Sequence, residues 1–147
     1  MPTSPYDFIR RNRDMQFATD AGTKMHERLR KITIDTDTTC GDSALVENIR
    51  ANKNLIEYFS PAGRTEVPVA GTINGKFISR RIDRMIIDPD AKVVKILDYK
   101  TDTDRNIHRG KYKAQLREYR ELLREIYPDF SIVTAILWTH DWTLEYV

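Results

Sequence analysis

Hydrophobic positions recur along the chain with two different periods, and these periods predict where helices and strands form. An apolar stripe at intervals of three and four over Met25–Ile32 predicts a helix that begins after an N-cap at Thr19 or Asp20. The polar, threonine-rich segment 33–42 predicts a loop. A second helix is expected over about 43–53. The first third of the chain is therefore predicted to be helical.

The pattern changes from helical to β after residue 64. Three β-type segments, 66–73, 76–87 and 92–101, are separated by the turn sequences Asn74-Gly75 and Asp88-Pro89-Asp90. They predict a meander of three antiparallel strands.

A longer helical pattern follows, from about 107 to 127, and ends before Pro128. Segments 132–139 and 143–147 then predict one or two further strands. The order of elements indicates an α+β fold, with helices flanking a mainly antiparallel or mixed central sheet.

Composition limits the class of protein. The 147 residues fit one domain, with N-terminal helices over 1–60 and the core over 64–147. Cys40 is the only cysteine, so no internal disulfide is expected, and no membrane span or secretory signal is visible. We expect an intracellular, cytoplasmic protein. The net charge of +2 gives no strong polyanion signal by itself.

Two aspartates stand out in the predicted meander. If the second and third strands pair about the centre of Asp90–Ala91, Asp83 faces Asp98, and Lys100 points the same way as Asp98. Facing carboxylates repel each other, and burial raises the cost. A divalent cation held by both carboxylates would satisfy this geometry. The alternative is that both aspartates are surface residues paired with neighbouring cations.

The same residues carry a resemblance to a known family. The segments Ile82–Arg84 and Asp98–Thr101, the latter followed by a helix with Tyr112, Gln115 and Tyr119, resemble the active-site hairpin of the PD-(D/E)XK nuclease superfamily, and within it the RecB and AddA subgroup. The upstream segments Ala21–His26 and Glu66–Pro68 extend the resemblance over residues 21 to about 140. It implies a restriction-endonuclease-like fold with an αβββαβ core.

The resemblance also implies roles for individual residues. Mg²⁺, for which Mn²⁺ could substitute, would be bound by His26, Asp83, Asp98 and the main-chain carbonyl of Tyr99. Lys100 would hold or deprotonate the attacking water, and Glu66 would lie near the metal or the lysine. No iron–sulfur cluster is expected, because one cysteine cannot hold it.

Further residues are expected to support catalysis or to contact DNA. These are Tyr112, Gln115, Tyr119, Arg109 and Lys111. Each has a purely structural alternative: Gln115 could mark the edge of the apolar stripe, His26 could be a packing residue, and a basic helix is commonly just a solvated face.

The expected function is a Mg²⁺-dependent DNA nuclease, acting as a single-strand exonuclease in double-strand-break repair. Its partners would be single-stranded DNA or duplex ends, a helicase domain of the same parent protein and an AddB-like subunit. No ATP site is expected, because Gly71–Phe77 lacks the spacing and the Ser/Thr of a phosphate loop. A non-catalytic DNA-binding domain and a structure-selective endonuclease are the alternatives.

Overall fold

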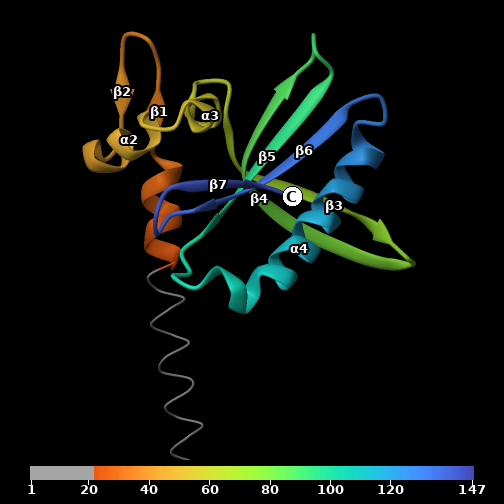
Figure 1. Cartoon of the computed structure of the whole chain (residues 1–147). Helices are drawn as coiled ribbons and strands as arrows, with labels where there is room; N and C mark the ends of the chain where they lie inside the picture. Colours follow the sequence, from red (N-terminus) through yellow and green to blue (C-terminus); the bar gives the residue numbers. More distant parts are fainter. Residues whose placement is uncertain (1–21) are drawn as a thin grey trace, which may run out of the picture.

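The computed structural model describes residues 22–147 (Figure 1). Its first element is a helix over residues 22–30, so the predicted N-cap at Thr19 or Asp20 lies outside the described residues. The predicted apolar stripe is confirmed in its central part, because Leu29 is completely buried.

The predicted loop over 33–42 is wrong in part, because it contains a small hairpin. Strands β1 (Thr33–Ile34) and β2 (Thr39–Cys40) pair in antiparallel fashion. The Asp35 N–H donates to the Thr38 carbonyl at 2.9 Å and closes the turn. The β-branched residues of both strands favour this extended pairing over an irregular loop.

The second predicted helix is confirmed but is shorter than expected. Helix α2 covers Ser43–Arg50, and the Asn52 side chain then caps a separate turn, α3 (Lys53–Ile56), by accepting from the Asn54 N–H. A 3₁₀ turn, η1 (Glu57–Phe59), follows directly. Asn52 divides the helix because its side chain can cap a new N-terminus.

The remaining elements agree closely with the predicted ones. They are β3 (Arg64–Ile73), β4 (Lys76–Asp88), β5 (Val93–Lys100), α4 (Arg105–Ile126), β6 (Ser131–Trp138) and β7 (Thr143–Tyr146). The sheet has the order β3-β4-β5-β6-β7, with β5 and β6 parallel and the other pairs antiparallel. This confirms the α+β class and the αβββαβ order. None of the helices in residues 22–147 has the length and apolarity needed to cross a membrane.

Each face of the sheet carries its own core. Helix α4 packs on one face, while the helix over 22–30, α2, α3 and η1 cover the other (Figure 1). Side chains of β5 alternate between the two, so Ile96 packs toward α4 and Leu97 and Tyr99 pack toward the N-terminal helices. By the same alternation Asp98 belongs to the α4 face.

Strand β4 changes its pairing at Asp83. The ladder between β3 and β4 skips the pair Glu66 and Asp83. The ladder between β4 and β5 ends at the pair Arg84 and Leu97, so it does not include Asp83 and Asp98. Glu66 has a left-handed backbone, with φ of 54°. Beyond this point β5 continues only beside β6, so β4 and β5 separate and leave the Asp83 side chain between them.

Candidate active site

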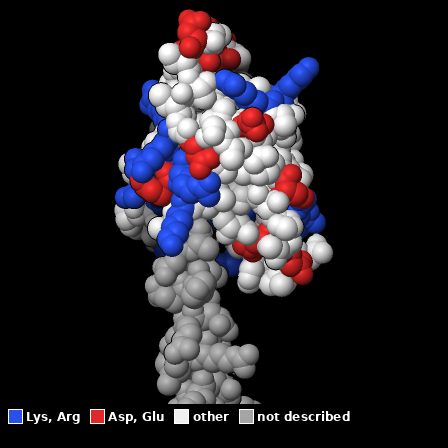
Figure 2. Space-filling model, turned by 90° about the vertical axis from the view of Figure 1, so that its left-hand side faces the viewer, with Lys and Arg blue, Asp and Glu red and all other residues white. Residues whose placement is uncertain are grey.

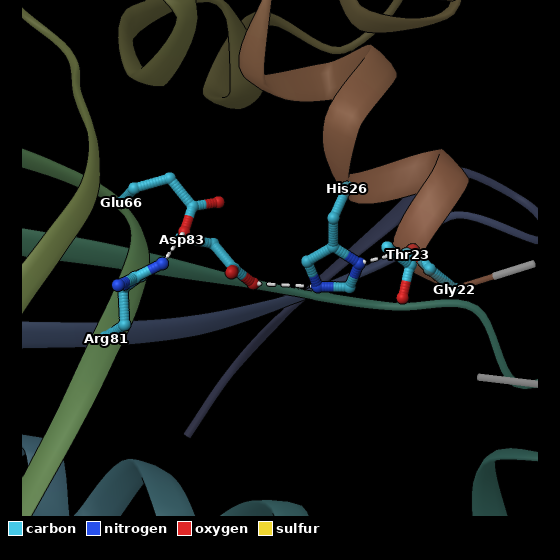
Figure 3. Close-up of a pocket in the computed structure, with 6 residues that line it drawn as sticks. All are labelled: Gly22, Thr23, His26, Glu66, Arg81 and Asp83. Atoms are coloured by element: carbon cyan, nitrogen blue, oxygen red, sulfur yellow. Dashed lines mark hydrogen bonds and ion pairs between the residues drawn. The ribbon is translucent and has the colours of Figure 1, made fainter. Parts of the chain in front are cut away.

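The Asp83 carboxylate lies at the centre of the site. Its Oδ2 accepts the main-chain N–H of Tyr99 at 2.8 Å, a donor left free where β4 and β5 separate. The same oxygen lies 3.2 Å from Nε2 of His26 (Figure 3). Asp83 therefore joins the end of the hairpin to the N-terminal helix. The predicted metal ligation by the Tyr99 carbonyl stays a prediction.

His26 is oriented from within its own helix. Its Nδ1 lies 2.7 Å from the carbonyl oxygen of Gly22, so Nδ1 carries a proton and Nε2 is directed at Asp83. The hydrogen bond to the Asp83 carboxylate raises the pKa of His26 to about 8, against the lowering effect of partial burial. A carbonyl that fixes one ring nitrogen and directs the other at an acidic centre is also the usual arrangement around metal-binding histidines.

Asp98 is the buried carboxylate of the site, with 4% of its surface exposed. Burial raises its pKa well above the usual aspartate range, Lys100 opposes this shift, and the neighbouring Asp83 adds to it. The Lys100 ammonium is 2.9 Å from Oδ2 of Asp98, yet that oxygen has no well-aligned hydrogen bond among the described residues. We therefore regard the contact as a charge pair that leaves the oxygen only partly satisfied. The predicted register is confirmed as far as the pair Arg84 and Leu97, which is adjacent to Asp83 and Asp98.

Helix α4 holds Lys100 in place. The ammonium donates to Oε1 of Gln115 at 3.0 Å and lies 4.2 Å from the centre of the Tyr112 ring. Nε2 of Gln115 donates to the Tyr119 hydroxyl at 2.9 Å, and the Tyr112 hydroxyl donates to Asp102 at 2.7 Å. Gln115 thus faces the site, and the two tyrosines support Lys100 from the helix side.

Glu66 lies in the same pocket as His26 and Asp83. The pocket has a volume of about 380 Å³ and is also lined by Gly22, Thr23 and Arg81. Figure 3 shows Glu66 and His26 approaching Asp83 from opposite sides. Oε2 of Glu66 is 3.7 Å from the Arg81 guanidinium, so this acid is paired on the solvent side of the pocket. The structure thus places Glu66 in the pocket of His26 and Asp83, and its expected position near the metal or the lysine stays a prediction, as does its catalytic role.

Arg84 is an important residue that the sequence pattern did not identify. It is 1% exposed, and its guanidinium donates to four oxygens at 2.7 to 3.0 Å. These are the Tyr99 hydroxyl and the carbonyls of Tyr58, Leu29 and Ile32. The guanidinium carbon also lies 4.0 Å above the Phe59 ring. Arg84 therefore fixes the helix that carries His26 against the strand that carries Asp83.

Several basic residues of α4 contact groups in other parts of the chain. Three arginines are occupied within the chain: Arg105 pairs with Asp141, Arg109 pairs with Glu145, and Arg120 donates to Thr134 and to the Val147 carbonyl. Arg109 thus faces β7 rather than Lys100. Figure 2 shows the left-hand side of the molecule in Figure 1, the side away from α4, and there basic and acidic side chains are interspersed.

The donor set fits a hard divalent cation. Two carboxylates and one imidazole are oxygen and nitrogen ligands that Mg²⁺ or Mn²⁺ accepts, and Oδ2 of Asp98 is a buried acceptor without a good hydrogen bond. Over residues 22–147, no three acidic, His or Cys side chains already surround a common point. Asp83 instead contacts His26 and neighbours Asp98, and the ligand set stays a prediction.

Comparison with known proteins adds little to this geometry. No family model matches the chain, and no curated protein matches it. Among solved structures it is similar to a candidate exonuclease from Eubacterium rectale, at 17% identity and a TM-score of 0.47, over 100% of this chain and 60% of the other. It is also similar to the protein SSO0001, at 18% identity and a TM-score of 0.41, over 71% and 46%. The chain thus covers less than two thirds of either protein.

Proposed function

We propose that this chain is a metal-dependent nuclease that hydrolyses DNA phosphodiester bonds. The observation that carries the proposal is the meeting of Asp83, Asp98 and Lys100 where β4 and β5 separate, with His26 added from a distant helix. A buried, under-satisfied carboxylate next to a second carboxylate is unfavourable without a cation. Two neighbouring carboxylates that can hold a cation, together with a lysine held in position, suit the hydrolysis of a phosphodiester bond.

The residues have separate tasks in this mechanism. Asp83 and Asp98, with His26 beside them, would hold Mg²⁺ or Mn²⁺, which supplies an acidified water and stabilises negative charge on the phosphate. Lys100 is held by Gln115 and Asp98 and would orient the attacking water as an ammonium or, as a neutral amine, accept its proton. Gln115, Tyr112 and Tyr119 keep the ammonium in position.

The finer assignment is single-strand exonuclease activity in double-strand-break repair. It is supported by the resemblance of Ile82–Arg84 and Asp98–Thr101 to the RecB and AddA subgroup. The chain would then act beside a helicase domain of the same parent protein, together with an AddB-like subunit, on single-stranded DNA or duplex ends in the cytoplasm.

Cleavage of end-labelled linear single-stranded DNA tests the proposal. We expect degradation with millimolar Mg²⁺ or Mn²⁺ and none in EDTA, because both carboxylates need the cation. Lys100→Ala should reduce the rate about 10²- to 10⁴-fold, which is the usual contribution of a positioned proton-transfer group. Lys95→Ala is a matched control, because Lys95 lies on the same strand but pairs with Glu57 away from the site.

Two results would contradict the proposal. One is cleavage that continues in EDTA, and the other is an equal rate for Lys100→Ala and Lys95→Ala. A circular single-stranded substrate separates the modes of cleavage, since an exonuclease leaves it intact and an endonuclease opens it. DNA binding without any metal-dependent cleavage would support the non-catalytic alternative.

Metal binding should also be visible in thermal stability. A cation that binds only the folded chain stabilises it by about 1.4 kcal/mol at ten times its Kd, or roughly 3–6 °C for a domain of this size. We expect such an increase in Tm with Mg²⁺ or Mn²⁺, measured against NaCl of equal ionic strength. Asp83→Asn should remove most of the increase. An unchanged Tm in the native chain at saturating metal would contradict the predicted site.

A further inference from the structure

A second pocket lies beside Lys100 and does not include His26. It is lined by β4 and α4 together with the end of β5, and its volume is about 430 Å³. The lining residues are Arg80, Lys100, Lys111, Tyr112, Ala114, Gln115 and Glu118. This volume falls within the range of about 300–1,000 Å³ that small-molecule sites occupy.

The two pockets differ in charge. The pocket around His26 contains the acids Glu66 and Asp83 with one arginine, whereas the second pocket contains Arg80, Lys100 and Lys111 with one acid, Glu118. Glu118 lies 3.3 Å from Arg80, and Asp98 lies 2.9 Å from Lys100, so Lys111 carries the unpaired positive charge of this pocket. Lys111 is exposed and makes no ion pair within residues 22–147. The second pocket therefore favours an anion.

We propose that the second pocket binds a phosphate group of the substrate strand next to the bond that is cleaved, with Arg80 and Lys111 as the contacts. This inference rests on the proposed nuclease function. It also gives the path of the DNA strand, which Asp83 and Asp98 alone do not define. The DNA strand would pass from Asp83 and Asp98 beside Lys100 and continue along α4.

The position of Lys100, which contacts Asp98 and also lines the second pocket, is the geometric reason. The Lys100 ammonium is 2.9 Å from Oδ2 of Asp98 on one side, and on the other it lines the pocket beside Gln115 and the Tyr112 ring. A phosphate in the pocket is therefore separated from the acidic centre by a single side chain. Phosphate contacts from Lys and Arg fix the register of a nucleic acid without reading its sequence.

Steady-state cleavage of single-stranded DNA in Mg²⁺ tests the inference. Lys111→Gln and Arg80→Gln should each raise KM about 5- to 20-fold and change kcat less than about 3-fold, because a charged hydrogen bond to the substrate is lost while the acidic centre is intact. Each should also lower the slope of log affinity against log salt by about 0.7, the value for one phosphate on a single strand.

Arg117→Gln is the matched control. Arg117 is an exposed arginine of the same helix that does not line the pocket, so the loss of one positive charge is equal. If Lys111→Gln and Arg80→Gln behave like Arg117→Gln in both KM and salt slope, the inference is overturned. Binding of a fluorescent oligothymidylate in EDTA gives a readout that needs no cleavage. It separates failure of this pocket from failure of the proposed nuclease function.

The oligothymidylate is used with hydroxyl ends and with a terminal phosphate. Loss of affinity in the Arg80 and Lys111 variants with both probes identifies an internal phosphodiester as the ligand. Loss with the phosphorylated probe alone identifies a terminal phosphate, and either result supports a phosphate site. If the Arg80 and Lys111 variants bind both probes as tightly as the native chain and Arg117→Gln do, the phosphate site is contradicted.

Discussion

Asp98→Asn is expected to abolish metal-dependent cleavage, with a loss of about 10³-fold or more, and at the same time to raise the Tm of the metal-free chain. The activity falls because the amide removes the charge with which Asp98 would hold the cation. A bound cation contributes several kcal/mol of charge stabilisation, and each 1.36 kcal/mol is about tenfold in rate. The measurement is cleavage of labelled single-stranded DNA in Mg²⁺.

The gain in stability follows from the raised pKa of Asp98. The folded chain holds the Asp98 proton more tightly than the unfolded chain, since burial disfavours the charged form. The contribution of Asp98 to stability is therefore fully present below the pKa of an unfolded aspartate and is lost as the pH rises through the raised pKa of the folded chain. An amide in place of the carboxyl group cannot ionise, so the Asp98→Asn variant should lack this decrease.

The two chains should accordingly differ little near pH 4 and increasingly toward neutral pH in EDTA. At pH 8 we expect the variant to be more stable by on the order of 1–2 kcal/mol, measured by urea unfolding. Asp90→Asn is the control, because Asp90 is exposed in the turn of the same hairpin. An Asp98→Asn chain that is less stable than the native chain at pH 8 would contradict the burial penalty.

Arg84→Met is expected to lower the free energy of unfolding by about 3–5 kcal/mol. The variant keeps much of the apolar stem but leaves four oxygens without their shared donor, and each unsatisfied buried acceptor costs about 1–3 kcal/mol, partly relieved by local shifts. For a domain with a total stability of about 5–15 kcal/mol this is a large fraction. Urea unfolding with two-state analysis gives the value.

Arg81→Met is the natural comparison, because Arg81 lies three residues earlier on the same strand. Its side chain is 70% exposed and makes one ion pair, with Glu66, at 3.7 Å. Such a surface pair contributes about 0–1 kcal/mol. If both variants lose the same small amount, the buried guanidinium does not connect the helix over 22–30 to the sheet as we describe.

The strand register could be predicted from the sequence because its signals are local. The turn at Asp88-Pro89-Asp90 and the alternation of apolar residues fix which residues of β4 and β5 face each other, and with them the proximity of Asp83 and Asp98. Helix α4 was predictable for the same reason, and the structure places Gln115 beside Lys100, whereas its predicted role toward DNA is not tested by this contact.

Interactions between distant segments could not be predicted in this way. Arg84 binds main-chain carbonyls of Leu29 and Ile32, which any residue type could supply, so no pattern at those positions reveals the contact. The only local signal is an arginine next to the apolar Met85. Similarly, nothing near Arg109 in the sequence indicates that it forms an ion pair with Glu145.

The change in β4 at Asp83 has a consequence for how the hairpin of β3 and β4 tolerates changes in length. A one-residue shift along a strand exchanges its two faces, and β4 contains such an exchange: Ile78 and Ile82 pack toward α4 before Asp83, and Met85 does so after it. The part of β4 before Asp83, which pairs with β3, and the part after Asp83, which pairs with β5, therefore direct their side chains independently. Adding or removing residues in pairs at the Asn74-Gly75 turn would therefore change the length of the β3–β4 hairpin and leave Asp83 and Asp98 in place.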